Sequence, residues 1–272
     1  STDPITAADK NIGSLTVHVS CNDAAAAGAE PIGLLVTLLI PPHGTEEEVE
    51  RIASELAEAA RLANIEIIGG HTEVTASVTR YVTCAAVIAR AGKNGIITPA
   101  GMKAGQDIIM TKMAGIEGTA VIASDAAGRT GLTDAELEEA RGFMSMVSVV
   151  KEGLYAAEHG ATAMHDITEG GVFGAAWEMA EASGCGMVLY PEKVLMHPIT
   201  KKICQKFGID PYRLISSGSM LIACDDGEGM VKGLAAIGIP AAVIGKAVES
   251  GVSTADGTEI PAPEADELYK II

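Results

Sequence analysis

The sequence predicts a mixed α/β protein with two domains. Its 272 residues are enough for two domains of ordinary size. Apolar runs of strand length alternate with segments of helical periodicity along the whole chain. Hydrophobic residues make up 48% and aromatic residues 3%, a composition typical of a compact globular protein rather than a disordered one. We therefore expect the chain to fold on its own.

Strand-like and helical segments alternate in the first hundred residues. Thr45 and Glu48 form a capping box that predicts the start of a helix, and apolar residues recur at helical spacing up to Ala63. The strand at 65–68 is expected to lead into a turn at Gly69-Gly70. The other expected elements are strands at 15–20, 33–40 and 78–89, and a short alanine-rich helix at 23–28.

Residues 91–105 are rich in Gly, Pro and Lys and show no clear periodicity, as is typical of a domain linker. We place the boundary near Gly101, which gives domains 1–100 and 101–272. In the second domain, Thr133 and Glu136 predict another capped helix. The remaining expected strands are 107–111, 163–164, 187–190, 220–224 and 241–244, and the helices are 117–124, 144–159, 172–182, 199–207 and 230–237.

Charge and hydropathy exclude two classes of partner. The formal net charge is -17, with 19 Lys and Arg against 36 Asp and Glu, so the basic surface that nucleic acids and anionic membranes require is missing. The longest strongly apolar run, 32–41, is half of the roughly 20 residues that span a bilayer. The surplus of carboxylates is compatible with divalent cations. We expect neither a nucleic-acid nor a membrane partner.

The cysteine pattern and the N-terminus favour the cytoplasm. Five cysteines are scattered along the chain without a CxxC pair, and an odd number of this kind is typical of a reducing compartment. We interpret them as small core residues rather than metal ligands. No secretory signal pattern opens the sequence.

Three polar segments, 20–23, 69–75 and 164–171, follow apolar runs, where open α/β sheets form ligand crevices. Magnesium prefers oxygen ligands, which makes Asp3, Asp23, Glu73 and Asp166 candidates. Two glycine pairs, 69–70 and 170–171, would let backbone amides approach a phosphate. Together these segments suggest a magnesium-nucleotide site.

Structural roles compete with each of these interpretations. Asp23 suits a helix N-cap, Asp3 and Asp166 suit turns, and glycine pairs often serve a turn alone. His71 and His165 are candidates for phosphate contact or proton transfer, but a histidine in a turn is usually satisfied by its neighbours. The GxGxxG, GxxxxGK[ST] and GxSxG patterns do not occur in their proper contexts.

Four motifs, in order and spacing, resemble the aminoimidazole ribonucleotide synthetase (PurM-like) superfamily. They are Thr2-Asp3-Pro4-Ile5, Cys21-Asn22-Asp23, Gly69-Gly70-His71-Thr72-Glu73 and His165-Asp166-Ile167-Thr168-Glu169-Gly170-Gly171. Within it, residues 182–186 and 207–211 most resemble the hydrogenase-maturation protein HypE. The resemblance extends over essentially the whole chain.

The resemblance implies a two-domain PurM-like fold: an N-terminal β-sheet domain with helices that dimerises, and a C-terminal α/β domain. It also implies ATP and Mg²⁺ in the cleft, phosphorylation of an amide-type or acid-type oxygen, and then dehydration or ligation. The implied partners are a second copy, a small-molecule or protein-bound acceptor, and a maturation partner protein.

The same resemblance implies roles for individual residues. His71 stands where many members have an acidic ligand, so Glu73 is expected to take over from it, and both are catalytic candidates. The implied magnesium ligands are Asp3, Asp23 and Asp166, and the implied cofactor-binding residues are Asn22, Asp23, Gly69, Gly70, Thr72, Asp166, Gly170 and Gly171.

The chain departs from the family in three places. Ser1 lies close to the second motif, so the usual N-terminal phosphate-binding segment is expected to be missing. The ending Tyr269-Lys270-Ile271-Ile272 lacks the terminal cysteine of HypE, so self-modification is not expected, and Ser216 to Gly218 stand where HypE has a glutamate. The alternatives are an enzyme like aminoimidazole ribonucleotide synthetase or thiamine-phosphate kinase, and a nucleotide-binding scaffold without catalysis.

Overall fold

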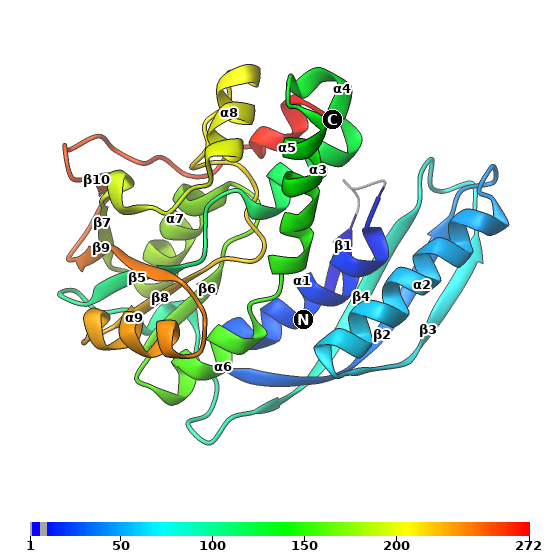
Figure 1. The fold of residues 1–272 in the computed structure, drawn as a ribbon. Coiled ribbons are helices and arrows are strands. Elements are labelled where there is room, and N and C mark those ends of the chain that lie inside the picture. Colours follow the sequence, from blue (N-terminus) through cyan, green and yellow to red (C-terminus); the bar gives the residue numbers. More distant parts are fainter. Residues whose placement is uncertain (1, 6–9) are drawn as a thin grey trace.

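The structure, a computed structural model, describes residues 2–5 and 10–272, with only the backbone at residues 2 and 3 (Figure 1). The strands are β1 (Thr2–Ile5), β2 (Ala29–Ile40), β3 (Glu66–Val74), β4 (Val82–Ala91), β5 (Asp107–Thr111), β6 (Ala163–Asp166), β7 (Gly186–Leu189), β8 (Met220–Cys224), β9 (Ala241–Val248) and β10 (Val252–Thr254). Within the described residues they form a four-stranded sheet of order β1-β4-β2-β3 and a six-stranded sheet of order β10-β7-β9-β5-β8-β6. The predicted mixed α/β, two-domain fold is confirmed.

Helices pack against both sheets, and those on the N-terminal sheet lie on one of its faces (Figure 1). The helices are α1 (Ile12–Ala26), α2 (Glu46–Ala63), α3 (Ile116–Asp125), α4 (Ala127–Thr130), α5 (Asp134–Gly142), α6 (Val150–Glu158), α7 (Gly171–Ser183), α8 (Pro198–Phe207) and α9 (Gly227–Ala236). Short 3₁₀ helices are η1 (Pro99–Gly101), η2 (Phe143–Met146), η3 (Pro191–Lys193) and η4 (Glu267–Lys270). In the part of the chain that is described, no helix is long and apolar enough to cross a membrane.

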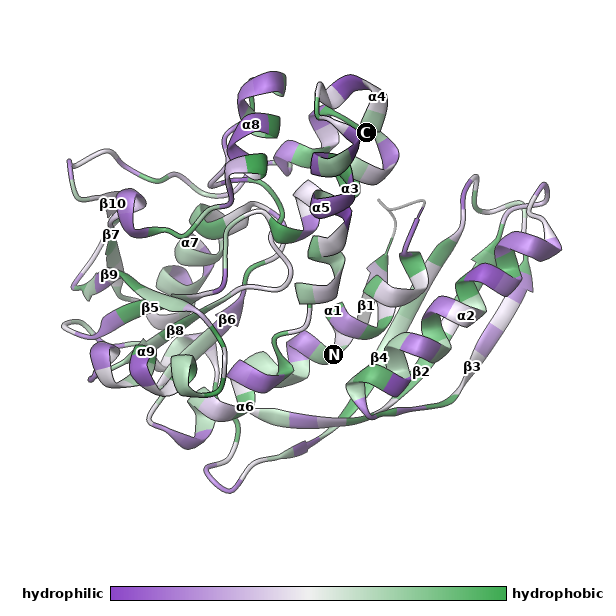
Figure 2. Cartoon of the chain, in the orientation of Figure 1, coloured by the Kyte–Doolittle hydropathy of each residue, from purple (hydrophilic) through white to green (hydrophobic). Residues whose placement is uncertain are grey.

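The N-terminal sheet is covered by α1 and α2 on one face. Alternate residues of β2 point to this face and are buried, as expected for a half-covered strand: Leu34, Val36, Leu38 and Ile40. Both predicted capping boxes, Thr45 with Glu48 and Thr133 with Glu136, are confirmed. In each, the threonine hydroxyl accepts a hydrogen bond from the glutamate's backbone amide, and the glutamate carboxylate accepts one from the threonine's backbone amide. Hydrophilic and hydrophobic residues alternate along α2 in Figure 2, as its half-exposed position requires.

The predicted strand at 15–20 is wrong, because these residues lie inside α1, which also includes most of the predicted helix at 23–28. Helix α1 packs against α2, β4, α6 and β6, and most of its surface is buried. Its polar residues are buried too: Thr16 donates to the Ile12 carbonyl and lies 2.6 Å from the hydroxyl of Thr83. A helix buried on every side shows no amphipathic period, so its sequence resembles an alternating strand.

The predicted turn at Gly69-Gly70 is also wrong, because β3 continues through both glycines to Val74. Gly70 has φ +147°, and a Cβ there would lie 1.8 Å from the carbonyl oxygen of Val36 on β2. A bulge between Leu34 and Leu35 shifts the register at this point. The glycines therefore permit close approach of two strands.

Two further boundaries differ. The predicted helix at 144–159 is split into η2 and α6 by residues 147–149, and the strand that begins at Ala163 extends to Asp166. The remaining predicted elements of the second domain are present with ends shifted by a few residues. Residues 92–106 connect β4 to β5, and the domain boundary near Gly101 stays a prediction.

All five cysteines are free thiols, and three of them are buried: Cys21, Cys204 and Cys224. Burial raises the pKa of the first two thiols to about 12 and that of the third to about 11. Such thiols stay protonated at neutral pH, which agrees with their interpretation as core residues.

Substitution of the two neighbouring glycines in β3 separates packing from turn formation. Gly70→Ala is expected to lower the free energy of unfolding by more than about 2 kcal/mol, because the methyl group meets a backbone carbonyl at a strained φ. Gly69→Ala is expected to cost less than about 1 kcal/mol, since its Cβ would meet only the Leu35 side chain, at 3.2 Å. Chemical denaturation measures the free energy of unfolding of both variants. Equal losses would contradict the close approach of the two strands as the reason for glycine at position 70.

Candidate functional site

Asp23 and Asp166 line the same cavity, which has a volume of about 310 Å³. Asp23 comes from the last turns of α1, and Asp166 is the last residue of β6. The small residues Ala26 and Ala27 leave space beside Asp23, while Met164 and His165 line the strand side. The cavity is also lined by Ile96, Ile97, Thr98 and Pro99 from the segment that connects the two sheets.

The Asp166 carboxylate is buried, and its surroundings disfavour a negative charge. Burial raises its pKa to about 6, and the negative charge of Asp23 acts in the same direction. Its Oδ2 atom is shielded from solvent and has no hydrogen-bond partner among the described residues. Two carboxylates in one cavity, one with an unused oxygen, suit a divalent cation, which would relieve their repulsion.

His165 and Glu178 form a polar pair beside Asp166, and His165 holds the Asp166 backbone. The His165 ring donates from Nδ1 to the carbonyl oxygen of Asp166 at 2.6 Å, and its Nε2 lies 3.2 Å from a Glu178 carboxylate oxygen. Burial lowers the pKa of His165, but the hydrogen bond to Glu178 and the charge of Asp166 outweigh it and raise the pKa. The sequence did not indicate Glu178, because it lies in the middle of α7 without a motif around it.

Both polar atoms of the Asn22 side chain already have partners within the protein. It is completely buried, its amide nitrogen donates to the Val147 carbonyl at 2.7 Å, and its oxygen accepts from the Val149 amide at 2.8 Å. The geometry gives no support to the prediction that Asn22 binds the cofactor directly.

The amides of Gly170 and Gly171 already have partners in the protein. Gly170 donates to the carboxylate of Asp266 at 2.7 Å, and Gly171 donates to the Thr168 carbonyl at 3.1 Å. A Cβ on Gly171 would lie 2.7 Å or less from backbone oxygens of Tyr212 and Leu214, so this glycine permits close packing. Phosphate binding by these amides stays a prediction. The sequence did not reveal that Asp266 accepts a hydrogen bond from Gly170.

The motif at 69–73 lies outside the cavity. It forms part of β3 at the edge of the described sheet, and all residues of that strand are exposed. His71 and Glu73 are close to each other, with 3.4 Å between Nε2 and a carboxylate oxygen, but their side chains are 64% and 53% exposed. Within one chain, therefore, Gly69, Gly70, His71, Thr72 and Glu73 do not join Asp23 and Asp166.

Asp3 pairs with Ala85 through the β1–β4 backbone, and its side chain lies outside the described residues. Over the residues that the structure describes, no group of three or more His, Cys, Asp or Glu side chains could hold a metal ion. The cavity thus provides two carboxylates. Two are enough for magnesium when phosphate oxygens and water complete its coordination.

Comparison with known protein families shows to which family the two domains belong. The family described as AIR synthase related protein matches the chain with its N-terminal domain over residues 1–91 and its C-terminal domain over residues 103–257. The chain belongs to the AIR synthase related family. The predicted PurM-like relationship is thereby confirmed.

Relatives of this AIR synthase related protein include hydrogenase-maturation proteins. A putative hydrogenase expression/formation protein of Methanocaldococcus jannaschii is 29% identical over 78% of the chain and 62% of its own length. Carbamoyl dehydratase HypE of Rhizobium leguminosarum bv. viciae is 33% identical over 88% of the chain and 68% of its own length. The chain thus spans about two thirds of the length of these relatives.

Solved structures show the same fold. The crystal structure of Escherichia coli HypE superimposes with a TM-score of 0.85 at 25% identity, over 100% of this chain and 87% of that one. HypE in complex with ATP gives a TM-score of 0.84 at 20% identity, over 100% and 86%. A HypE–HypF complex gives 0.81 at 23% identity, over 97% and 90%. At these identities the last two support the fold alone.

The buried carboxylate makes stability depend on pH. The pKa of Asp166 rises from its ordinary 3.8 to about 6 on folding, so the folded state binds more protons between these values. The free energy of unfolding therefore falls as pH rises from about 4 to 6, by up to about 3 kcal/mol from this group. Asp166→Asn should remove this loss and stabilise the ligand-free protein at about pH 7.5, with a smaller gain at about pH 4.5.

Urea denaturation at the two pH values measures this effect, with Glu249→Gln, an exposed site, as the control. A variant that is destabilised equally at both pH values would contradict the assigned electrostatics.

Proposed function

We propose that this protein binds ATP together with Mg²⁺ between its two domains and phosphorylates an amide-type or acid-type oxygen of a substrate, as a step toward dehydration or ligation. The observation that carries the proposal is the shared cavity of Asp23 and Asp166, in which the buried Asp166 keeps an unpartnered oxygen. The cost of holding these like charges together is recovered when a cation binds between them.

The chemistry requires little from the protein beyond position and charge. Phosphorylation converts a poorly leaving oxygen into phosphate, and bound magnesium supplies positive charge that neutralises the transferring group. Asp23 and Asp166 would hold the metal, and His165 keeps Asp166 in place through its hydrogen bond to the carbonyl oxygen. Glu178 in turn orients the His165 ring.

The relatives support this choice among ATP-dependent reactions. HypE relatives are carbamoyl dehydratases, and a HypE of the same fold binds ATP. We propose that the acceptor here is a small molecule or a group on a partner protein. The HypE–HypF complex favours a maturation partner for this chain too.

We propose that a second copy of the chain completes the site. Residues of the N-terminal sheet that point away from α1 and α2 include Leu35 and Ile88, whose side chains are 43% and 42% exposed. The strand register places His71 and Glu73 on this same face, beside Thr37 and Leu39. Pairing of two such faces would bury the apolar residues and bring 69–73 into an enclosed environment. We also propose the cytoplasm as its location, in agreement with the free cysteines.

Magnesium-dependent ATP binding tests the proposed function. Asp23→Asn and Asp166→Asn are each expected to weaken it by at least about tenfold, because each removes one carboxylate from the cation. Isothermal titration with and without Mg²⁺ measures the affinity, and Glu249→Gln serves as the exposed acidic control.

Unchanged affinity in both variants would remove these carboxylates from the site, and no ATP binding by the unmodified protein would refute the proposal. Tight binding without turnover, for any acceptor with an amide or acid oxygen, would favour the scaffold alternative.

The oligomeric state tests the proposed pairing. The mass in solution is expected to be twice 27.8 kDa. Leu35→Glu and Ile88→Glu place a charge on the pairing face and should shift the protein toward monomer. Leu62→Glu is the matched control, because Leu62 is 64% exposed on α2, on the other side of the sheet. Light scattering over a concentration series measures the mass, and a monomer at every concentration contradicts the pairing.

A further inference from the structure

Residues 147–149, which separate η2 from α6, are held by a side chain of α1. The amide of Asn22 makes two hydrogen bonds with them, one to the Val147 carbonyl and one from the Val149 amide. Both are short, and Asn22 is fully buried, so the contact replaces backbone hydrogen bonding that the break in the helix would otherwise leave unmade. Asn22 immediately precedes Asp23.

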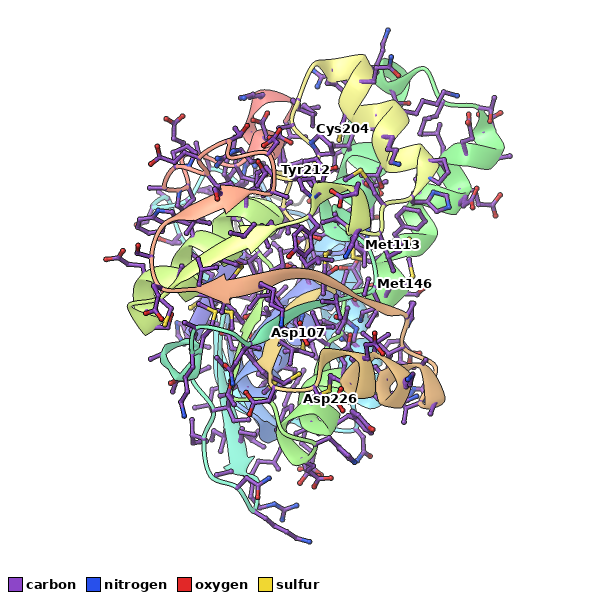
Figure 3. The ribbon with its side chains drawn as sticks, turned by 90° about the vertical axis from the view of Figure 1, so that its left-hand side faces the viewer. Asp107, Met113, Met146, Cys204, Tyr212 and Asp226 are labelled. Atoms are coloured by element: carbon purple, nitrogen blue, oxygen red, sulfur yellow. The ribbon has the colours of Figure 1, made fainter. Side chains whose placement is uncertain are left out.

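A lysine that follows β5 in the second domain also holds this segment. The Lys112 ammonium donates to the carbonyls of Met146 at 3.1 Å and Ser148 at 2.6 Å, and lies 2.6 Å from a Glu152 oxygen. Figure 3 shows Met146 beside Met113, the residue that follows Lys112, so the segment lies against the end of β5. Two side chains thus fix the four consecutive residues 146–149. Asn22 comes from α1, which packs on the N-terminal sheet, and Lys112 follows β5 of the six-stranded sheet.

This arrangement is costly, which indicates a role beyond packing. The Lys112 side chain is 8% exposed and that of Glu152 is fully buried, and removing two charges from water carries a large desolvation penalty. Lys112 also has φ +52°, a left-handed conformation that disfavours a residue with a Cβ. Replacement of such ion pairs by apolar residues is often neutral or stabilising, so stability alone does not account for it.

The network continues to the strand that supports Asp166. Thr111 links Glu152 to β8: its hydroxyl lies 3.5 Å from the Glu152 oxygen and accepts from the amide of Met220 at 3.1 Å. Met220 is the register partner of Asp166 in the β6–β8 pair. A chain of polar contacts therefore leads from the residue before Asp23 to the residue opposite Asp166.

We propose that Asn22 and Lys112 are positioning residues that hold Asp23 at a set distance from Asp166. The two carboxylates line one cavity and carry like charges, so their approach in the ligand-free protein needs a rigid support. The clamp, defined as Asn22, residues 146–149, Lys112 and Glu152, provides it without touching the cavity. Its effect on ATP rests on the proposed function, whereas its effect on geometry does not.

Asn22→Ala removes both hydrogen bonds at the α1 side. Crystal structures of this variant and of the unmodified protein, both without ligand, should show the Asp23 carboxylate displaced relative to Asp166 by about 1 Å or more. The double variant Lys112→Met/Glu152→Gln, which leaves no lone buried charge, should displace it too. An unmoved Asp23 in both structures overturns the proposal, whether or not the protein binds ATP.

Titration with ATP and Mg²⁺ gives the second measurement. Asn22→Ala should weaken binding about tenfold or more in the unmodified background and cause no further loss in an Asp23→Asn background, because it acts through Asp23. Ile203→Ala, in the core around α8 and away from α1, is the control for lost stability and should leave the affinity within about twofold. Equal losses for Asn22→Ala in both backgrounds would overturn the positioning role.

If the unmodified protein binds no ATP, the proposed function fails by itself. The crystallographic comparison then still decides whether the clamp sets the position of Asp23.

Discussion

The burial of α1 between the two sheets is the constraint on which the rest of the structure depends. This helix packs against α2 and β4 on one side and against α6 and β6 on the other. At Gly13, a Cβ would lie only 2.5 Å from the Ile52 carbonyl, so α1 and α2 approach more closely than larger residues would allow. Every displacement of α1 would therefore disturb both cores, and Asp23 is carried by a rigid element.

The parts of the fold that depend on local signals were predictable from the sequence. Thr45 with Glu48 and Thr133 with Glu136 define helix starts through contacts three residues apart, and both helices begin where expected. Helix α1 was mistaken for a strand because its character is set by neighbours distant in sequence, which cover all of its sides. The glycine pair in β3 was mistaken for a turn because the approach of Val36 that requires Gly70 is a long-range contact.

The candidate site divides in the same way. That Asp23 and Asp166 belong together followed from polar residues at the ends of apolar runs and from the family motifs, and the cavity contains both. Glu178, Asp266 and residues 147–149 could not be inferred, since they meet their partners across 13, 96 and up to 127 residues without a recognisable pattern. The exposed motif at 69–73 shows a different limit, because its surroundings depend on what covers the sheet.

The contact between Asp266 and Gly170 changes how ligand affinity at α7 has to be understood. The first amide of this helix start already donates to a carboxylate from the C-terminal segment, whose pKa is raised by its own burial. A phosphate bound there would have to displace an anion that the protein itself supplies. The measured free energy of phosphate binding would then be the difference between the free energies with which phosphate and the Asp266 carboxylate bind this helix end. Mobility of the C-terminal segment would change that difference directly.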